Sequence, residues 1–251
     1  MPSHMSSIGF PVRSREEFRD LALKAAREGE PIEARGGSYV RWSPGSGVEL
    51  WAQVTRSGEV VGMNPHYSGG ATTRVGLTSR VVRKEHSPDG GFYGWASPGD
   101  QDPDSGWYPF VFDAPDYELH RDLQLPAIRE VQLAAFAHEI RAYRSDEEYE
   151  EARLRGDRGS GLAAEAFIPS GLFKPGGEAI KPPQAHAVLA GHVLEARLLR
   201  NPVTEVSFQW ARVRTYGAEV DVVAAPEAIE GRLVEGGVLS GSFWLSGCIG
   251  K

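Results

Sequence analysis

Apolar and polar residues alternate along most of the chain, in short runs that Gly- and Pro-containing turns separate. In the first half such runs cover residues 37–42, 48–54 and 59–63. Alternation over about 4–8 residues between Gly-rich turns is typical of antiparallel strands joined by hairpins. The second half predicts strands over 187–199, 206–215, 219–224 and 237–245. The pattern therefore predicts a β-rich α+β protein whose strands form curved sheets or a barrel.

Two segments have a helical start signal. One follows Ser14 and the other follows Ser145, and acidic residues come directly after each serine. Serine is a good N-cap, and carboxylates in the first turn suit the helix dipole. An apolar run precedes each helix, at residues 8–12 and 131–136, and we expect both runs to be strands.

The two helices belong to a longer repeat. Arg13-Ser14 recurs as Arg144-Ser145, which is an offset of 144 − 13 = 131 residues. Three later blocks recur in the same order: 80–83 as 197–200, 92–96 as 208–211, and 111–116 as 222–227. The sequence therefore predicts an internal duplication, with a first α+β unit at 1–125 and a second, diverged copy at 126–251. The middle hairpin of the second copy is predicted to be shortened or absent. The duplication is compatible with one barrel or with two domains.

The N-terminal quarter has the motifs of a known module. Residues 7–12 form an apolar run, a helix follows Ser14, and 43–51 read Ser-Pro-Gly-Ser-Gly-Val-Glu-Leu-Trp. These features resemble the βαβββ module of the vicinal oxygen chelate superfamily, to which glyoxalases and bleomycin-resistance proteins belong. The resemblance implies paired modules, and in metal-dependent members a His on the first strand joins a Glu on the last. Glu49 matches that Glu, but Ser7 stands in the first-strand position. We therefore expect the scaffold without a bound metal or cofactor.

The charge balance limits the possible partners. The chain has 27 basic and 34 acidic residues, a net charge of −7, and its arginines are interleaved with acidic residues. A protein that grips phosphate backbones usually presents a basic stripe, so nucleic acid is not expected as a partner. No apolar run is long enough for a membrane span, and no signal-peptide pattern opens the chain. The single cysteine, Cys248, forbids an internal disulfide. We expect a cytoplasmic protein.

A polar segment at the end of a predicted strand is the first candidate site. Residues 62–70 contain Asn64, His66 and Tyr67, and loops at strand ends are where binding sites collect. The functional hypothesis is a ligand pocket with His66 as acid or base. The alternative is an Asn-Pro turn with solvated side chains. Glu49 is the second catalytic candidate. By alternation it shares a strand face with Trp51, so it is a buried, paired carboxylate if that face is inner and a solvated residue otherwise.

Aromatic residues concentrate in the predicted strands. Trp42, Trp51 and Trp95, with Trp210, are candidates for a concave face on which a flat ligand stacks. The alternative is that they fill the core. Two functions remain open. The first is a small-molecule-binding protein or metal-independent enzyme. The second is a non-enzymatic interaction protein that self-associates through its aromatic strands, as a possible homodimer.

Overall fold

The computed structural model describes residues 4–35, 37–83, 88–157, 159–173 and 177–250. The helices are α1 (Arg15–Glu28), α2 (Asp146–Arg155) and the 3-10 helices η1 (Ser6–Ile8), η2 (Tyr117–His120) and η3 (Pro226–Ala228). The first strands are β1 (Glu30–Ala34), β2 (Gly37–Gly45), β3 (Val48–Thr55), β4 (Val60–Tyr67), β5 (Thr72–Val82), β6 (Gly90–Ala96) and β7 (Pro109–Ala114). The remaining strands are β8 (Ala127–Tyr143), β9 (Ala166–Ile168), β10 (His186–Arg200), β11 (Ser207–Thr215), β12 (Ala218–Ala224), β13 (Ile229–Gly231) and β14 (Val238–Ile249).

Both predicted helices form, and both have the predicted serine caps. The backbone N–H of Glu17 donates to the hydroxyl of Ser14, and that of Glu148 donates to the hydroxyl of Ser145. Each of these glutamates accepts a hydrogen bond from the backbone N–H of the arginine that precedes the serine. The two helix starts therefore share one reciprocal arrangement, a variant of the capping box in which the glutamate bonds the N–H of the residue before the cap.

The strand predicted over 8–12 does not form. Residues 6–8 are a 3-10 helix, and Gly9 then takes a left-handed conformation with φ of 80°. A Cβ at this glycine would lie 2.7 Å from Cβ of Asn201, so the chain needs glycine there to pass close to the loop after β10. Ile8 and Phe10 are both buried against the second half of the protein. These residues are therefore apolar because they are buried in a tight turn, and not because they pair as a strand.

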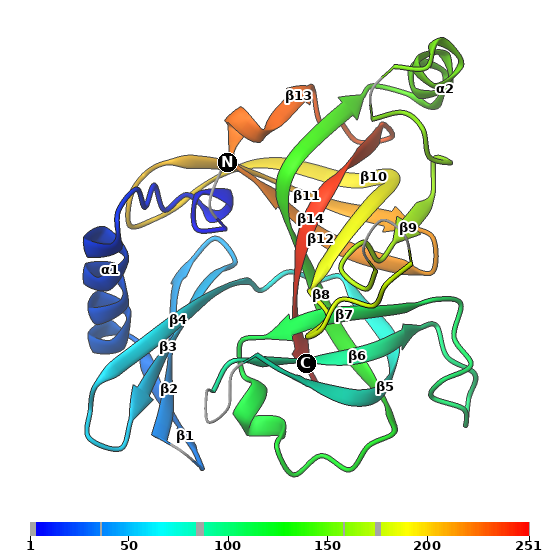
Figure 1. Cartoon of the computed structure of the whole chain (residues 1–251). Helices are drawn as coiled ribbons and strands as arrows, with labels where there is room; N and C mark the ends of the chain where they lie inside the picture. The colour runs from blue at the N-terminus through cyan, green and yellow to red at the C-terminus, as the bar shows by residue number, and fades with distance from the viewer. Residues whose placement is uncertain (1–3, 36, 84–87, 158, 174–176, 251) are drawn as a thin grey trace.

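A four-stranded antiparallel sheet, β1-β2-β3-β4, carries α1 on one face (Figure 1). Trp42 lies on this covered face, where Lys24 of α1 is 5.5 Å from its ring centre. The opposite face bears Trp51, Gln53 and His66 and packs against the rest of the protein. Both faces of β3 are therefore buried, which makes the apolar alternation along it less clear than on a solvated strand.

The other strands form a ten-stranded sheet that closes on itself twice. The first barrel consists of β5, β6, β7, β14 and β8, and the second consists of β10, β11, β12, β8 and β14, each in order around the barrel. The two barrels share β8 and β14, which run from one barrel to the other in Figure 1. The expected β-rich architecture with curved sheets is confirmed.

The two barrels have the same order of strand pairing, although the strand parallel to the meander comes last along the chain in the first barrel (β14) and first in the second (β8). In the first, β5, β6 and β7 form an antiparallel meander, β7 is parallel to β14, and β8 pairs with β14 and β5. In the second, β10, β11 and β12 form the meander, β12 is parallel to β8, and β14 pairs with β8 and β10. A shared order of strand pairing describes the fold and carries no function.

One row of paired residues crosses the junction of the two barrels. Asp113 of β7 pairs with Ser246 of β14, Ser246 pairs with Ala134 of β8, and Ala134 pairs with Asp221 of β12. From either end, the row begins at the third strand of one meander, crosses the two shared strands and ends at the third strand of the other meander. No helix among the described residues is long and apolar enough to cross a membrane.

Candidate functional site

The inner face of the four-stranded sheet meets the first barrel through polar side chains. Gln53 Nε2 and Asn64 Nδ2 both donate to Oδ1 of Asp89, at 2.5 and 2.9 Å. Glu49 is 4% exposed and accepts a hydrogen bond from the indole Nε1 of Trp51 at 2.9 Å. The strand face that carries Glu49 and Trp51 is therefore an inner face, and Glu49 is the buried, paired carboxylate expected in that case.

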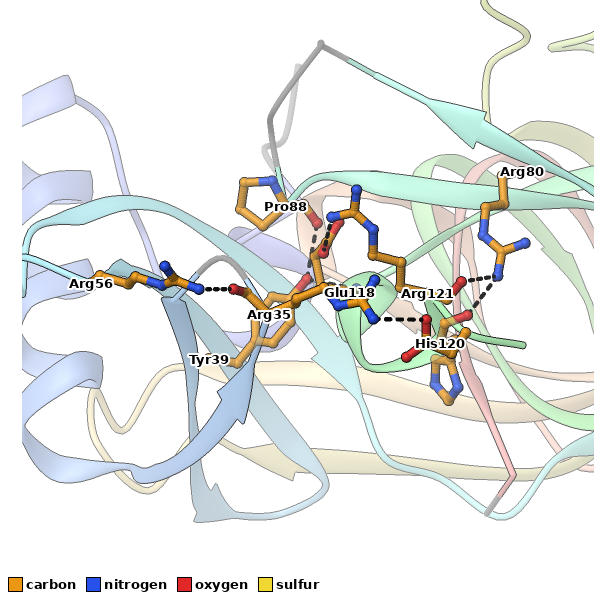
Figure 2. A network of polar contacts seen from close by, with 9 residues as sticks. Arg35, Tyr39, Arg56, Arg80, Pro88, Glu118, His120 and Arg121 are labelled. Carbon is orange, nitrogen blue, oxygen red and sulfur yellow. Dashed lines mark hydrogen bonds and ion pairs between the residues drawn. The ribbon is translucent and has the colours of Figure 1, made fainter. Parts of the chain in front are cut away.

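A second polar contact joins the same sheet to η2 (Figure 2). The hydroxyl of Tyr39 donates to the carbonyl of Pro88 at 2.9 Å and accepts from the backbone N–H of Glu118 at 3.1 Å. Arg80 Nη2 donates to the backbone carbonyls of His120, Arg121 and Leu123, which fixes the chain as it leaves η2. These bonds hold the segment between β7 and β8 against the sheet.

His66 is fully buried between the sheet and the junction of the barrels. Its Nε2 lies 2.7 Å from Oε1 of Gln132, and its Nδ1 lies 2.8 Å from the hydroxyl of Ser246. Gln132 Nε2 donates to Oδ2 of Asp221, so the amide oxygen of Gln132 faces His66 and can only accept. His66 Nε2 therefore carries a proton, and in the neutral ring Nδ1 accepts from Ser246.

Asp221 anchors this network. Its carboxylate is fully buried and accepts three hydrogen bonds, from Gln132, from the backbone N–H of Ala71 and from the indole of Trp210. A Cβ at Gly69 would lie 2.1 Å from this carboxyl group, so the chain needs glycine where it passes Asp221. The chain of bonds from Ser246 to Trp210 connects β4, β14, β8, β12 and β11.

A serine that donates to a neutral imidazole is the pair that activates a nucleophile in many hydrolases. Here Ser246 and His66 have no exposed surface. The group that orients the imidazole is a neutral amide in place of a carboxylate. A substrate could therefore reach this hydroxyl only if the interface opened.

The other predicted site residues do not form one surface. Trp42 of β2 pairs with Leu50 of β3, and Trp51 of β3 pairs with Arg41 of β2. Because consecutive residues of a strand point to opposite faces, Trp42 and Trp51 lie on opposite faces of the sheet. Trp95 is half-buried in β6 of the first barrel, and Trp210 is buried in β11 of the second. The predicted concave tryptophan face is therefore wrong, because strand parity and two separate barrels divide its members. Tyr67 is buried near Trp210, and burial raises the pKa of its hydroxyl group.

A histidine cluster that the sequence did not reveal lies at the barrel junction. The ring of His4 stacks on Trp244 with centroids 4.2 Å apart, and its Nε2 is 3.2 Å from Nε2 of His138. His186 packs edge-on against His138 at 5.5 Å. Burial lowers the pKa of all three rings, and that of His4 falls to about 4, to which the neighbouring histidines also contribute. Among the described residues, no group of three or more His, Cys, Asp or Glu is arranged to hold a metal ion.

His138 points into this cluster because of a β-bulge. Ser242 of β14 pairs with Glu139, but the next residue, Phe243, pairs with Ala137, so His138 is left without a partner across the strand. A bulge re-aims one side chain of a strand, and its position depends on the pairing of distant strands. No signal in the local sequence could have predicted the meeting of His4, His138 and His186.

A groove of about 300 Å³ lies on the second barrel, where the ends of β10 and β11 meet η3 and β13. We call it the Arg232 groove. Its lining comprises Ala196, Arg197, Leu198, Gln209, Pro226, Ile229, Gly231, Arg232 and Leu233. The groove thus combines the guanidinium group of Arg232 and the amide of Gln209 with apolar side chains, whereas the guanidinium of Arg197 lies over Trp210 on the other face of β10 and β11. None of the site residues predicted from the sequence lines it, although Arg197 belongs to a repeated block.

The fold and these sites define a β-rich protein of two fused five-stranded barrels with a helix-backed sheet at its side. No protein-family model matches the chain, and searches of curated proteins and of solved structures found no match. The function must therefore be inferred from the sites themselves.

The Asp221 network predicts a large stability effect without any exposed change. Asp221→Asn places an amide NH₂ where three donors converge, so at least one buried donor loses its acceptor. We expect the free energy of unfolding to fall by about 2–4 kcal/mol, measured by urea denaturation at pH 7. Glu219→Gln, on the same strand but partly exposed, is the control and should change it by less than about 0.5 kcal/mol. Equal effects of the two substitutions would contradict the network.

The histidine cluster predicts acid sensitivity. The pKa of His4 is about 4 in the folded protein, against 6.5 for an unperturbed histidine, so the unfolded chain binds more protons between these values. The contribution of His4 is therefore present above pH 6.5 and is lost as the pH falls towards 4. We expect a loss of about 1–2 kcal/mol between about pH 7 and pH 4.5, allowing for the partial exposure of His4.

The matched variant for this test is His4→Phe, which keeps the stacking on Trp244 and cannot titrate. The difference between the urea midpoints at pH 7 and pH 4.5 should be smaller in this variant than in the natural chain. The same pH dependence in both proteins would show that His4 does not couple folding to protons.

Proposed function

We propose that this protein binds a small anionic molecule in the Arg232 groove and does not transform it. The observation that supports the proposal most directly is the exposed cationic side chain of Arg232 in a concave surface that Gln209 also lines. Guanidinium groups offer paired N–H donors that match the oxygens of a carboxylate or a phosphate.

The two arginines differ in how they are held. Arg197 forms an ion pair with Glu195, and its guanidinium lies 5.5 Å from the ring centre of Trp210. These contacts orient the guanidinium of Arg197, and Glu195 neutralises part of its charge. Arg232 is exposed and has no carboxylate partner among the described residues, so its charge is available to a ligand. We therefore assign Arg232 the larger share of anion binding.

The size and lining of the groove limit the ligand. A volume near 300 Å³ is at the lower end for small-molecule sites, which suits a compact ligand. Leu198 and Leu233 supply apolar surface beside the guanidinium group of Arg232, which favours an anion with an apolar body. The lining has no Ser, Cys, His, Asp or Glu side chain that could act as nucleophile or general base, which favours binding over catalysis.

We also infer that the two barrels arose from one duplicated unit. The order of strand pairing repeats in both, and the helix that precedes each meander begins with the same serine-capped arrangement. Each meander has a bulge in its first pairing, at Thr78 in β5 and at Leu194 in β10. Shortly after each bulge an arginine covers an aromatic ring directly across the strand: Arg80 covers Phe92, and Arg197 covers Trp210. These features support a duplication whose second unit begins after β8, near Arg144, whereas the sequence predicted a second copy that starts at residue 126.

Anion binding is tested by titration with phenyl phosphate, which combines an anion with a small apolar ring. Arg232→Gln should weaken binding roughly ten- to a hundredfold, because a charged hydrogen bond contributes about 1.5–3 kcal/mol. Isothermal titration calorimetry measures the difference. Arg19→Gln, an exposed arginine on α1, is the control and should leave the affinity unchanged.

Benzyl alcohol and benzylamine complete the design as neutral and cationic analogues, and neither should bind. Binding of all three compounds with equal affinity, or an Arg232→Gln protein that binds as tightly as the natural one, would reject the anion site.

The duplication is tested by superposing residues 72–143 on 186–249 in an experimental structure. We expect β5, β6, β7 and β8 to overlie β10, β11, β12 and β14, with Arg80 within one residue of Arg197. A fit that requires a different strand order or a larger shift in register would contradict a common origin.

A further inference from the structure

A column of aromatic rings leads from the core of the first barrel to the protein surface. Phe110 is buried and packs on Phe167, which stacks on Tyr108 with centroids 4.7 Å apart. Tyr108 in turn contacts Tyr216, and Tyr216 lies 4.7 Å from Trp107. The last two rings are 49% and 58% exposed. We call Trp107 and Tyr216 the aromatic platform.

The platform is rigid because two loops are tied together beneath it. Trp107 ends the loop between β6 and β7, and Tyr216 lies in the hairpin between β11 and β12. The hydroxyl of Tyr108 donates to the carbonyl of Tyr216 at 2.6 Å, and the hydroxyl of Ser97 donates to the carbonyl of Gly217 at 3.0 Å. Gly217 has a φ of 75°, which brings the hairpin within contact of both aromatic rings of the other loop. Large exposed rings held in this way lose little entropy on binding.

The loop that carries Trp107 is acidic. It contains Asp100, Asp102 and Asp104, and among the described residues only Asp100 of these three has an arginine partner, Arg74. Asp104 raises the pKa of Asp102. The exposed carboxylates of this loop therefore offer negative charge to a cationic partner.

We propose that the aromatic platform and the acidic loop form a docking surface for a basic segment of another protein. Arginine or lysine side chains would contact Asp102 and Asp104, and apolar or cationic groups beside them would lie on Trp107 and Tyr216. Aromatic faces attract cations, and acidic groups beside them add to that attraction.

Charge complementarity selects this occupant over the alternatives. A nucleic acid would bring its phosphates against the acidic loop. A second copy related by a twofold axis would bring the same three aspartates to face one another. A neutral saccharide could stack on the rings but would make no use of the negative charge of the loop. A polypeptide with basic and apolar residues satisfies both parts of the surface.

The experiment uses the full chain and a fluorescently labelled (Arg-Leu)₃ peptide, with binding followed by fluorescence anisotropy. We expect saturable binding that weakens as salt rises, and no binding of the matched (Glu-Leu)₃ peptide. Trp107→Ala should weaken binding at least fivefold. The double variant Asp102→Asn/Asp104→Asn should weaken it and flatten the salt dependence. Leu154→Ala and Asp122→Asn alter an exposed apolar and an exposed acidic residue elsewhere and should change nothing.

The outcomes separate the proposal from its competitors. Thermal unfolding of each variant shows whether the fold is intact, and the double aspartate variant tests the surface without touching its rings. Peptide binding that neither the Trp107 nor the aspartate changes affect would overturn the proposal. If maltohexaose quenches tryptophan fluorescence in the natural chain but not in Trp107→Ala, and no peptide binds, the platform is assigned to a saccharide. Dimerisation lost in Trp107→Ala would assign it to a second copy, and Ca²⁺ binding lost in the double variant, without peptide binding, would assign the loop to a metal.

Discussion

The antiparallel pairing of β8 with β14 is the constraint on which the rest of the protein depends. Every residue from Val238 to Ile249 pairs with β8, across a single bulge. On their outer edges the same two strands close both barrels: β8 accepts β5 and then β12, and β14 accepts β10 and then β7. Neither barrel can therefore close without a strand that the other barrel also uses. Because every such contact joins segments far apart in the sequence, we expect the two barrels to fold and unfold as one unit.

A buried polar network specifies how the helix-backed sheet sits on this junction. Burying His66, Gln132 and Asp221 costs desolvation free energy that apolar residues would not incur, but any shift of the sheet would leave one of them without a partner. An apolar interface of the same area would tolerate sliding. The network thus gives His66, one of the two catalytic candidates, a structural role in the packing of the sheet. It also explains why Gly69 is needed, since no side chain fits between the backbone and Asp221.

The two surfaces proposed for binding differ in charge and lie on different elements. The Arg232 groove is basic and lies beside η3 and β13, whereas the aromatic platform is flanked by carboxylates and lies where the β6–β7 loop meets the β11–β12 hairpin. Both use connections between strands, which can change without disturbing the barrels. Such a division would let one chain respond to a small anion and to a basic partner at separate places. The fold alone supports neither role, because one fold can serve many functions.

Local sequence determined the two capping boxes, the hairpins of the first sheet and the strands of the second half. Each of these depends on residues a few positions apart, such as Ser14 with Glu17. It failed at residues 8–12, where an apolar run without strand pairing fills a turn held by Gly9. It also failed for the tryptophans, because alternation assigns a face to Trp42 and to Trp51 but cannot say what covers that face. The histidine cluster, the Asp221 network and the aromatic platform were decided by tertiary structure alone. Their members come from segments up to 180 residues apart, as with His66 and Ser246, and only the closure of the shared strands brings them together.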